Sequence, residues 1–196
     1  QLGVALIDIG GGTTDIIIYN NRSVQHTAAI PLGGESITND IAYGLTITLE
    51  QAESLKCQHG LAKEALSNEK NNIIIKGTNE RDDVQISQKE LSGIIEARMT
   101  EIFHLVRSEI KKFNKEKQLN FGVVITGGGS KLENVEDLAL EVFGIEIKKG
   151  KPNSINGIDD IIDNPRYATT IGLIQYAVNN NSVVINNNSD DDLFHI

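Results

Sequence analysis

Two acidic residues and two threonines surround a run of three glycines near the start of the chain, a pattern that could bind phosphate. Residues 8–15 read Asp-Ile-Gly-Gly-Gly-Thr-Thr-Asp and follow an apolar run. Glycines in such a turn let backbone N–H groups approach an anion, because no Cβ stands in the way. The pattern predicts a phosphate-binding turn, although a glycine-rich β-hairpin without a ligand has the same pattern. The predicted participants are Asp8, as holder of a hydrated divalent cation, and Gly10, Gly11, Gly12, Thr13 and Thr14.

A second glycine turn occurs much later in the chain. Residues 125–132 read Ile-Thr-Gly-Gly-Gly-Ser-Lys-Leu, between a β-type run and a helical one. Backbone contact with a flat ligand beside a helix N-terminus is one interpretation, and close packing of a strand on a helix is the other. The residues concerned are Gly127, Gly128, Gly129 and Ser130. Two such turns in one sheet favour a ligand more than either turn does alone.

Glu53 and Lys56 are three residues apart in a predicted helix, so their side chains share one face. From the spacing alone an exposed ion pair is the favoured interpretation, and a contact with a ribose and an adenine is the functional alternative. The four histidines have no metal-ligand spacing to one another. Cys57 is expected to be a buried or half-buried helix residue without a role as a nucleophile.

Hydrophobic periodicity predicts the elements that must position these residues. An antiparallel meander is expected first, and Gly33-Gly34 ends it. The spacing of apolar residues then becomes helical. Thr48 is predicted to cap a helix that stops before Gly60. The strands are expected at 4–9, 13–19, 23–30, 121–126 and 145–148, with a small strand pair within 70–87. The helices are expected at 37–45, 49–58, from 88 onward, 132–143 and 166–178.

The long helix from residue 88 is predicted to bury one apolar stripe, and Ser87 to cap it. The stripe consists of Leu91, Ile94, Ile95, Ile102, Leu105, Val106, Ile110 and Phe113. Asn164 and Pro165 predict the cap and first residue of the last helix. Residues 179–196 are rich in Asn and Asp and are expected to form a flexible tail.

Composition excludes several classes of function. The 196 residues include 18 basic and 27 acidic side chains, a net charge of −9, so no nucleic-acid partner is expected. A single cysteine forms no intrachain disulfide, and no apolar run is long enough to span a bilayer.

Several of these segments resemble the actin-like ATPases. Residues 8–15 resemble their second phosphate loop, and residues 127–129 their adenosine loop. Residues 164–176 resemble the helix behind the nucleotide cleft, and residues 26–45 with 52–56 resemble the FtsA branch of the superfamily. The resemblance covers residues 1–178 and implies an α/β fold, one half of the two-lobed actin-like, RNase H-like architecture. Subdomain IIA would comprise residues 1–33 and 121–178, and subdomain IIB residues 34–120.

The resemblance also implies a ligand, ATP with Mg²⁺. Gly11, Gly12, Thr13 and Thr14 would face the β- and γ-phosphates, and Asp8 would organise the metal through water. The other nucleotide-contacting residues would be Gly10, Gly33, Gly34, Glu53, Lys56, Gly127, Gly128, Gly129 and Ser130. The first phosphate loop is expected in an N-terminal portion that precedes Gln1. At most a weak ATPase is expected of the longer parent, and no hydrolysis by this chain alone.

In the FtsA branch such a protein tethers the FtsZ ring to the inner face of the cytoplasmic membrane and recruits the division machinery. The resemblance implies that the FtsZ tail docks within residues 34–120 and that the parent self-associates as an actin-like polymer. A basic membrane helix is expected only beyond this acidic C-terminus. The alternative is another actin-like protein, either an assembly protein like MreB or PilM or an enzyme like the sugar kinases and chaperones.

Overall fold

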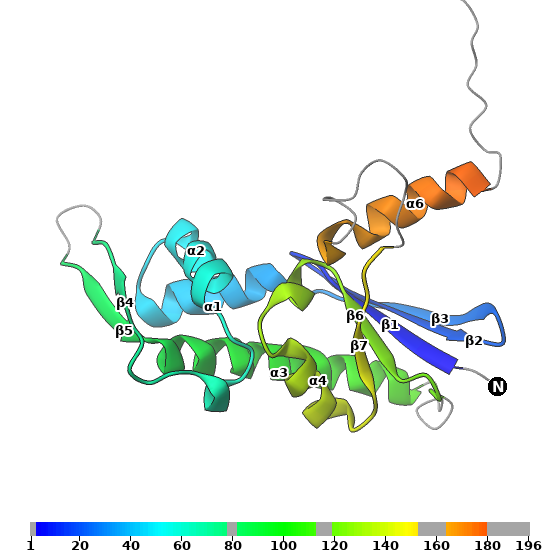
Figure 1. Cartoon of the computed structure of the whole chain (residues 1–196), viewed down its shortest axis with the longest axis horizontal. Coiled ribbons are helices and arrows are strands. Elements are labelled where there is room, and N and C mark those ends of the chain that lie inside the picture. The colour runs from blue at the N-terminus through cyan, green and yellow to red at the C-terminus, as the bar shows by residue number, and fades with distance from the viewer. Residues whose placement is uncertain (1–2, 78–81, 113–118, 153–163, 180–196) are drawn as a thin grey trace, which may run out of the picture.

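A five-stranded sheet carries both glycine turns at one end. The computed structural model describes residues 3–77, 82–112, 119–152 and 164–179 (Figure 1). The strand order is β3-β2-β1-β6-β7. The antiparallel meander is β1 (Gly3–Ile9), β2 (Thr14–Asn20) and β3 (Ser23–Ile30), and β6 (Val123–Thr126) and β7 (Ile147–Lys149) continue the sheet in parallel with β1.

Alternation along β1 decides which side chains enter the core. Ile7 and Ile9 are fully buried on one face, so Asp8 between them lies on the other face and is half-buried. Asn21 and Arg22 form the two-residue turn between β2 and β3, both with positive φ (51° and 63°). This conformation matches the right-handed twist of the strands that it joins.

The segment after the meander forms two helices and a separate two-stranded sheet. The helices are α1 (Gly34–Leu45) and α2 (Leu49–His59), and the sheet pairs β4 (Asn72–Ile75) with β5 (Val84–Ser87). Thr48 caps α2 as predicted, because its side chain accepts a hydrogen bond from the Gln51 N–H at 3.3 Å. A 3-10 turn at Glu64–Leu66 precedes β4.

Helix α3 (Gln88–Lys112) runs beneath both the α1–α2 pair and the five-stranded sheet (Figure 1). It contacts α1, α2 and β5 along one stretch, and β2, β3 and α4 (Val135–Phe143) along another. The rings of Phe103 and Phe143 meet edge to face with centroids 5.5 Å apart. One buried cluster therefore extends from Ala5 to Phe143, and the division into subdomains IIA and IIB stays a prediction.

The predicted stripe on α3 was wrong in part. Leu105 is 40% exposed, whereas Met99 and Phe103, which the prediction omitted, are fully buried. The helix presents residues 95, 99, 102, 103, 106 and 110 to the core, and position 105 falls outside that arc. Ser87 Oγ accepts from the Glu90 N–H at 3.1 Å, as a capping residue should. Phe113 lies outside the described residues.

The C-terminal elements begin later than predicted. Phe121 is 48% exposed and precedes β6, α4 begins at Val135, and β7 is shifted to Ile147–Lys149. The predicted last helix starts as a 3-10 turn at Pro165–Tyr167 and continues as α6 (Ala168–Asn179). Asn164 is its cap, as predicted, since its Oδ1 accepts from the Arg166 N–H at 3.1 Å.

Helix α6 lies on the side of the sheet opposite to α3 (Figure 1). The expected tail at residues 179–196 lies outside the described residues, apart from Asn179, which ends α6. Among the residues that the structure describes, no helix is both long enough and apolar enough to cross a membrane.

Candidate functional site

The glycine turn between β1 and β2 is held from behind by the start of α1. The Gly10 N–H closes the turn on the Thr13 carbonyl at 2.9 Å. The N–H groups of Gly34 and Glu35 donate to the carbonyls of Gly10 and Gly11 at 2.9 and 2.8 Å. The amides of Gly11 and Gly12 donate to no other group in the described part of the chain. The turn thus offers two N–H donors on an exposed edge, which is what an anion requires.

Gly33 and Gly34 are buried behind this turn. A Cβ at Gly33 would stand 2.5 Å from the Gly11 carbonyl oxygen and 2.7 Å from that of Gly10. No side chain fits at that distance, so Gly33 is required for the close approach of α1 to the turn. The two glycines predicted as ligand contacts therefore support the turn that offers the contacts.

The two threonines of the turn point in different directions. Thr14 follows the alternation of β2 into the core, is fully buried, and donates its hydroxyl proton to the Leu32 carbonyl at 2.8 Å. Thr13 is exposed and donates to the Asp15 carboxylate at 3.1 Å. Of the two predicted hydroxyl donors, Thr13 is the one that faces outward.

The second glycine turn packs directly against the end of β1, so the structure brings the two predicted turns together. A Cβ at Gly127, where φ is +84°, would lie 2.2 Å from Asp8 Oδ1. A Cβ at Gly129 would lie 2.3 Å from Ile9 Cγ2, whereas one at Gly128 would meet nothing within 4 Å. Ser130 is buried and donates to the Gly127 carbonyl at 2.8 Å. The open side of this turn is therefore at Gly128.

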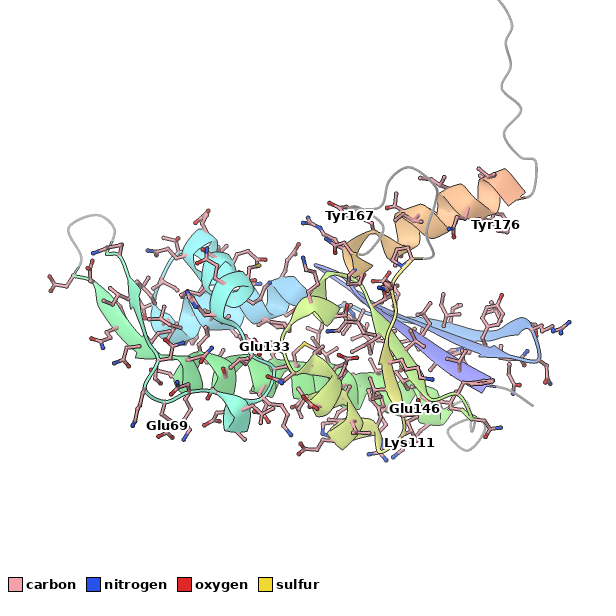
Figure 2. The ribbon with its side chains drawn as sticks, viewed as in Figure 1. Glu69, Lys111, Glu133, Glu146, Tyr167 and Tyr176 are labelled. Atoms are coloured by element: carbon pink, nitrogen blue, oxygen red, sulfur yellow. The ribbon has the colours of Figure 1, made fainter. Side chains whose placement is uncertain are left out.

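Asp8 is held by a residue that sequence reasoning missed. Thr169, in the first turn of α6, donates its hydroxyl proton to Asp8 Oδ2 at 2.6 Å. The same end of the helix is tied to the second turn, because the Gly127 N–H donates to the Pro165 carbonyl at 3.3 Å. Tyr167, labelled in Figure 2, marks this end of the helix, and Tyr176 marks the far end. The proximity of residues 8 and 169 has no signal in the local sequence.

Glu35 is a second residue that the sequence analysis missed. Its carboxylate lies over the first turn, with Oε1 3.0 Å from the position of a Cβ on Gly11 and Oε2 3.8 Å from one on Gly12. An exposed negative charge here opposes an anion at the turn unless a cation accompanies it.

The Glu53–Lys56 ion pair forms as the spacing predicted, but it is not fully exposed, because the Lys56 side chain is only 11% exposed. Lys56 Nζ lies 2.6 Å from Glu53 Oε2 and donates to the Gly34 carbonyl at 2.9 Å, so α2 is tied to the support of the first turn. Partial burial raises the pKa of Glu53, but hydrogen bonds from Lys56 and Thr38 outweigh it and the pKa is lowered overall. Thr38 was not singled out from the sequence.

Cys57 is exposed, which corrects the expectation that it is buried or half-buried. The buried positions of α2 are Ala52 and Leu55, and Cys57 lies away from them. Its Sγ donates to Glu53 Oε1 at 3.3 Å, and partial burial together with that carboxylate raises the pKa of the thiol.

The segment that follows α2 leads to the second turn. The Ala62 N–H donates to the Glu133 carbonyl at 2.8 Å, just after that turn, and Glu133 is labelled in Figure 2. Hydrogen bonds therefore join α2 to the support of the first turn, and the segment after α2 to the residues that follow the second turn. In the described residues no group of three or more His, Cys, Asp or Glu side chains could hold a metal ion by itself.

Comparisons of the sequence with known proteins point to one family. A family model described as "Cell division protein FtsA" matches residues 5–172. Cell division protein FtsA of Pseudomonas aeruginosa is 38% identical over 178 residues, which are 91% of this chain and 43% of that protein. The same protein of Bacillus subtilis is 41% identical over 182 residues, 92% of this chain and 40% of that protein. The chain thus spans less than half the length of these curated relatives.

Comparisons of the structure confirm the predicted fold, one half of the actin-like architecture. MreB5 of Spiroplasma citri bound to ADP superposes with a TM-score of 0.70 at 20% identity, covering 94% of this chain and 56% of that one. The same protein bound to AMPPNP gives a TM-score of 0.71 at 19% identity and covers 92% and 54%. The PilM–PilN type IV pilus biogenesis complex gives 0.65 at 16% identity and covers 90% and 46%.

Proposed function

Because the chain belongs to the FtsA family of cell division proteins, we propose that it is one half of an ATP-binding, actin-like protein that tethers FtsZ polymers to the membrane. The whole protein would act at the inner face of the cytoplasmic membrane at the division site, recruit the other division proteins and self-associate as a polymer. The observation that carries the proposal is the family match over residues 5–172, on a fold whose two glycine turns meet at Asp8.

The described residues would form one wall of a nucleotide-binding cleft. The amides of Gly11 and Gly12 would hold phosphate oxygens with help from Thr13, and the open side at Gly128 would border the adenosine. Glu53 and Lys56 would lie beside the ribose and adenine. The remaining predicted residues, Gly10, Thr14, Gly33, Gly34, Gly127, Gly129 and Ser130, would hold the two turns in place. MreB5, which shares the fold, has been crystallised with ADP and with AMPPNP, and this is consistent with a nucleotide here.

Mg²⁺ fits as a cation carried by the nucleotide. Magnesium keeps several waters and typically uses one or two carboxylates together with phosphate oxygens. Asp8 is one such carboxylate, and it is oriented by Thr169 through Oδ2. Bound there, the ion would neutralise part of the phosphate charge and would reduce the repulsion from Glu35.

A single wall open to water predicts weak binding. Each N–H that meets a phosphate gives up a hydrogen bond to water, so the net gain per contact is small. We expect the chain alone to bind Mg-ATP with a dissociation constant of about 1 mM or weaker, which is roughly 4 kcal/mol. We expect no hydrolysis above background, because this wall alone does not exclude water from the γ-phosphate.

Calorimetric titration with Mg-ATP tests the nucleotide part of the proposal. Gly12→Asp adds a carboxylate at the turn where a Cβ has room, its nearest neighbour being Glu35 Oε2 at 3.8 Å, and should abolish binding by repulsion. Gln85→Glu is the matched control, since it makes the same change of charge at an exposed position in β5. Equal affinities of the two variants would contradict the assignment of the phosphate turn.

The FtsZ tail peptide would dock within residues 34–120, and a cavity of about 380 Å³ is the candidate place. It lies between the α1–α2 connection and the β4–β5 pair and is lined by Tyr43, Ile47, Gln51, Lys76 and Val84, among others. Tyr43 is 91% exposed, and an exposed aromatic ring beside a hollow is a common anchor for peptides.

Titration with a synthetic FtsZ tail peptide tests the tether. Tyr43→Ser should weaken peptide binding about tenfold, and Tyr176→Ser, at a 70% exposed tyrosine on α6, should leave it unchanged. Binding of ATP at micromolar concentration together with no peptide binding would refute the tether and indicate a self-contained ATPase.

A further inference from the structure

Thr38 is buried in α1, against the ion pair that α2 presents to the site. The residue is 7% exposed, and the Lys56 and Glu53 side chains are 11% and 51% exposed. Thr38 Oγ1 accepts a hydrogen bond from Lys56 Nζ at 2.8 Å and donates its proton to Glu53 Oε2. The Gly34 carbonyl lies 3.1 Å from the same hydroxyl, but the hydroxyl has one proton and the charged carboxylate is the stronger acceptor.

The Lys56 ammonium uses all of its protons inside the protein. An ammonium has three N–H donors. Here they have three acceptors, the Gly34 carbonyl at 2.9 Å, Thr38 Oγ1 at 2.8 Å and Glu53 Oε2 at 2.6 Å. In this arrangement Lys56 orients Glu53 and joins α2 to α1, and the charge left to meet a ligand is that of Glu53.

The two oxygens of Glu53 have different surroundings. Oε2 accepts from both Lys56 and Thr38, whereas Oε1 meets only the weak thiol donor of Cys57, at 3.3 Å, among the described residues. The carboxylate is ionised at neutral pH, because the hydrogen bonds from Lys56 and Thr38 lower its pKa more than partial burial raises it. An ionised oxygen that is held in place and half-exposed accepts hydroxyl protons and repels phosphate.

We propose that Thr38 is a positioning residue that fixes Glu53 to read a ribose hydroxyl and so makes the site selective for ribonucleotides. The inference rests on the proposed nucleotide site and adds its selectivity. Without the Thr38 hydroxyl, Glu53 Oε2 keeps only Lys56 as a partner, and the carboxylate gains freedom to rotate. A rotating carboxylate loses hydroxyl selectivity, while the glycine turn keeps its hold on phosphates.

Titration of the chain with ATP, 2′,3′-dideoxyATP and tripolyphosphate, each with Mg²⁺, tests the inference. Wild-type protein should bind ATP about tenfold more tightly than the dideoxy analogue, the value of a good hydrogen bond to a charged group. Thr38→Val, which keeps the shape of the side chain, should reduce this ratio to about two, and Thr38→Ser should restore it. Tripolyphosphate should bind all three proteins equally, because the phosphate turn is unchanged.

The outcomes distinguish a failure of the proposed role of Thr38 from a failure of the proposed nucleotide site. If wild-type protein binds none of the three compounds, the nucleotide site itself is wrong. If it binds ATP and the dideoxy analogue equally, or if Thr38→Val keeps the full ratio, the nucleotide site stands and the role of Thr38 is refuted. Glu53→Gln gives an independent check at a half-exposed position, should the valine variant fail to fold, and must also lower the ratio.

Discussion

Replacing Gly127 by alanine tests the contact between the second turn and β1. Gly127 has φ 84° and ψ 177°, a region that only glycine adopts readily, and forcing another residue there costs about 1–3 kcal/mol. The new Cβ would stand 2.2 Å from Asp8 Oδ1 and 2.5 Å from the Ile9 carbonyl oxygen, so β1 or the turn must shift. Overpacking of this kind costs about 1–3 kcal/mol more.

We therefore expect Gly127→Ala to lower the free energy of unfolding by about 3 kcal/mol or more, which for a chain of this length lowers Tm by about 6–12 °C. Gly128→Ala is the matched control, since its Cβ would meet nothing within 4 Å. Its free energy of unfolding should lie within about 1 kcal/mol of the wild-type value. Urea and thermal unfolding followed by circular dichroism measure both variants. Equal midpoints for the two would refute the packing of this turn against Asp8.

Three further predictions concern the hydrogen bonds of Thr14, Arg98 and Glu53. Thr14→Val should cost about 1 kcal/mol in urea unfolding, because the Leu32 carbonyl loses a buried donor at 2.8 Å; an unchanged midpoint would contradict this. Arg98 holds Asp40 between α3 and α1 through two bonds of 2.5 and 2.9 Å, so a cycle of Arg98→Met and Asp40→Asn should give a coupling energy of about 1 kcal/mol, and additive effects would argue against the bridge. The lowered pKa of Glu53 stabilises the folded state above the ordinary value of 4.5, and this contribution is lost as the pH falls through the folded value. Glu53→Gln should therefore lose less stability than wild type between about pH 6 and about pH 3, and equal losses would contradict the shift.

Local sequence predicted most of the elements, because local interactions form them. Short apolar and β-branched runs bounded by turn residues specified the strands of the meander. Thr48 specified the start of α2, because its capping hydrogen bond spans only three residues. The Glu53–Lys56 pair followed from helical spacing alone. The arc of α3 was predicted less well, since Leu105 is exposed where Met99 and Phe103 are buried. Leu105 is as apolar as the buried residues of α3, so hydrophobicity alone does not distinguish them. Only the position of the sheet decides which side chains of the helix are covered.

The partners of the site residues were decided by tertiary structure. Thr169 reaches Asp8 across 161 positions of sequence, and Lys56 reaches Thr38 across 18. Threonine is an ordinary helix residue in both places, so its type carries no sign of the partner. By itself the sequence determined where glycine frees the backbone and where charge lies, because these are properties of single residues and short turns. Which carbonyl, carboxylate or helix end meets them was decided by the packing of β1, α1, α2 and α6 around one core, because these hydrogen bonds join residues that only folding brings together.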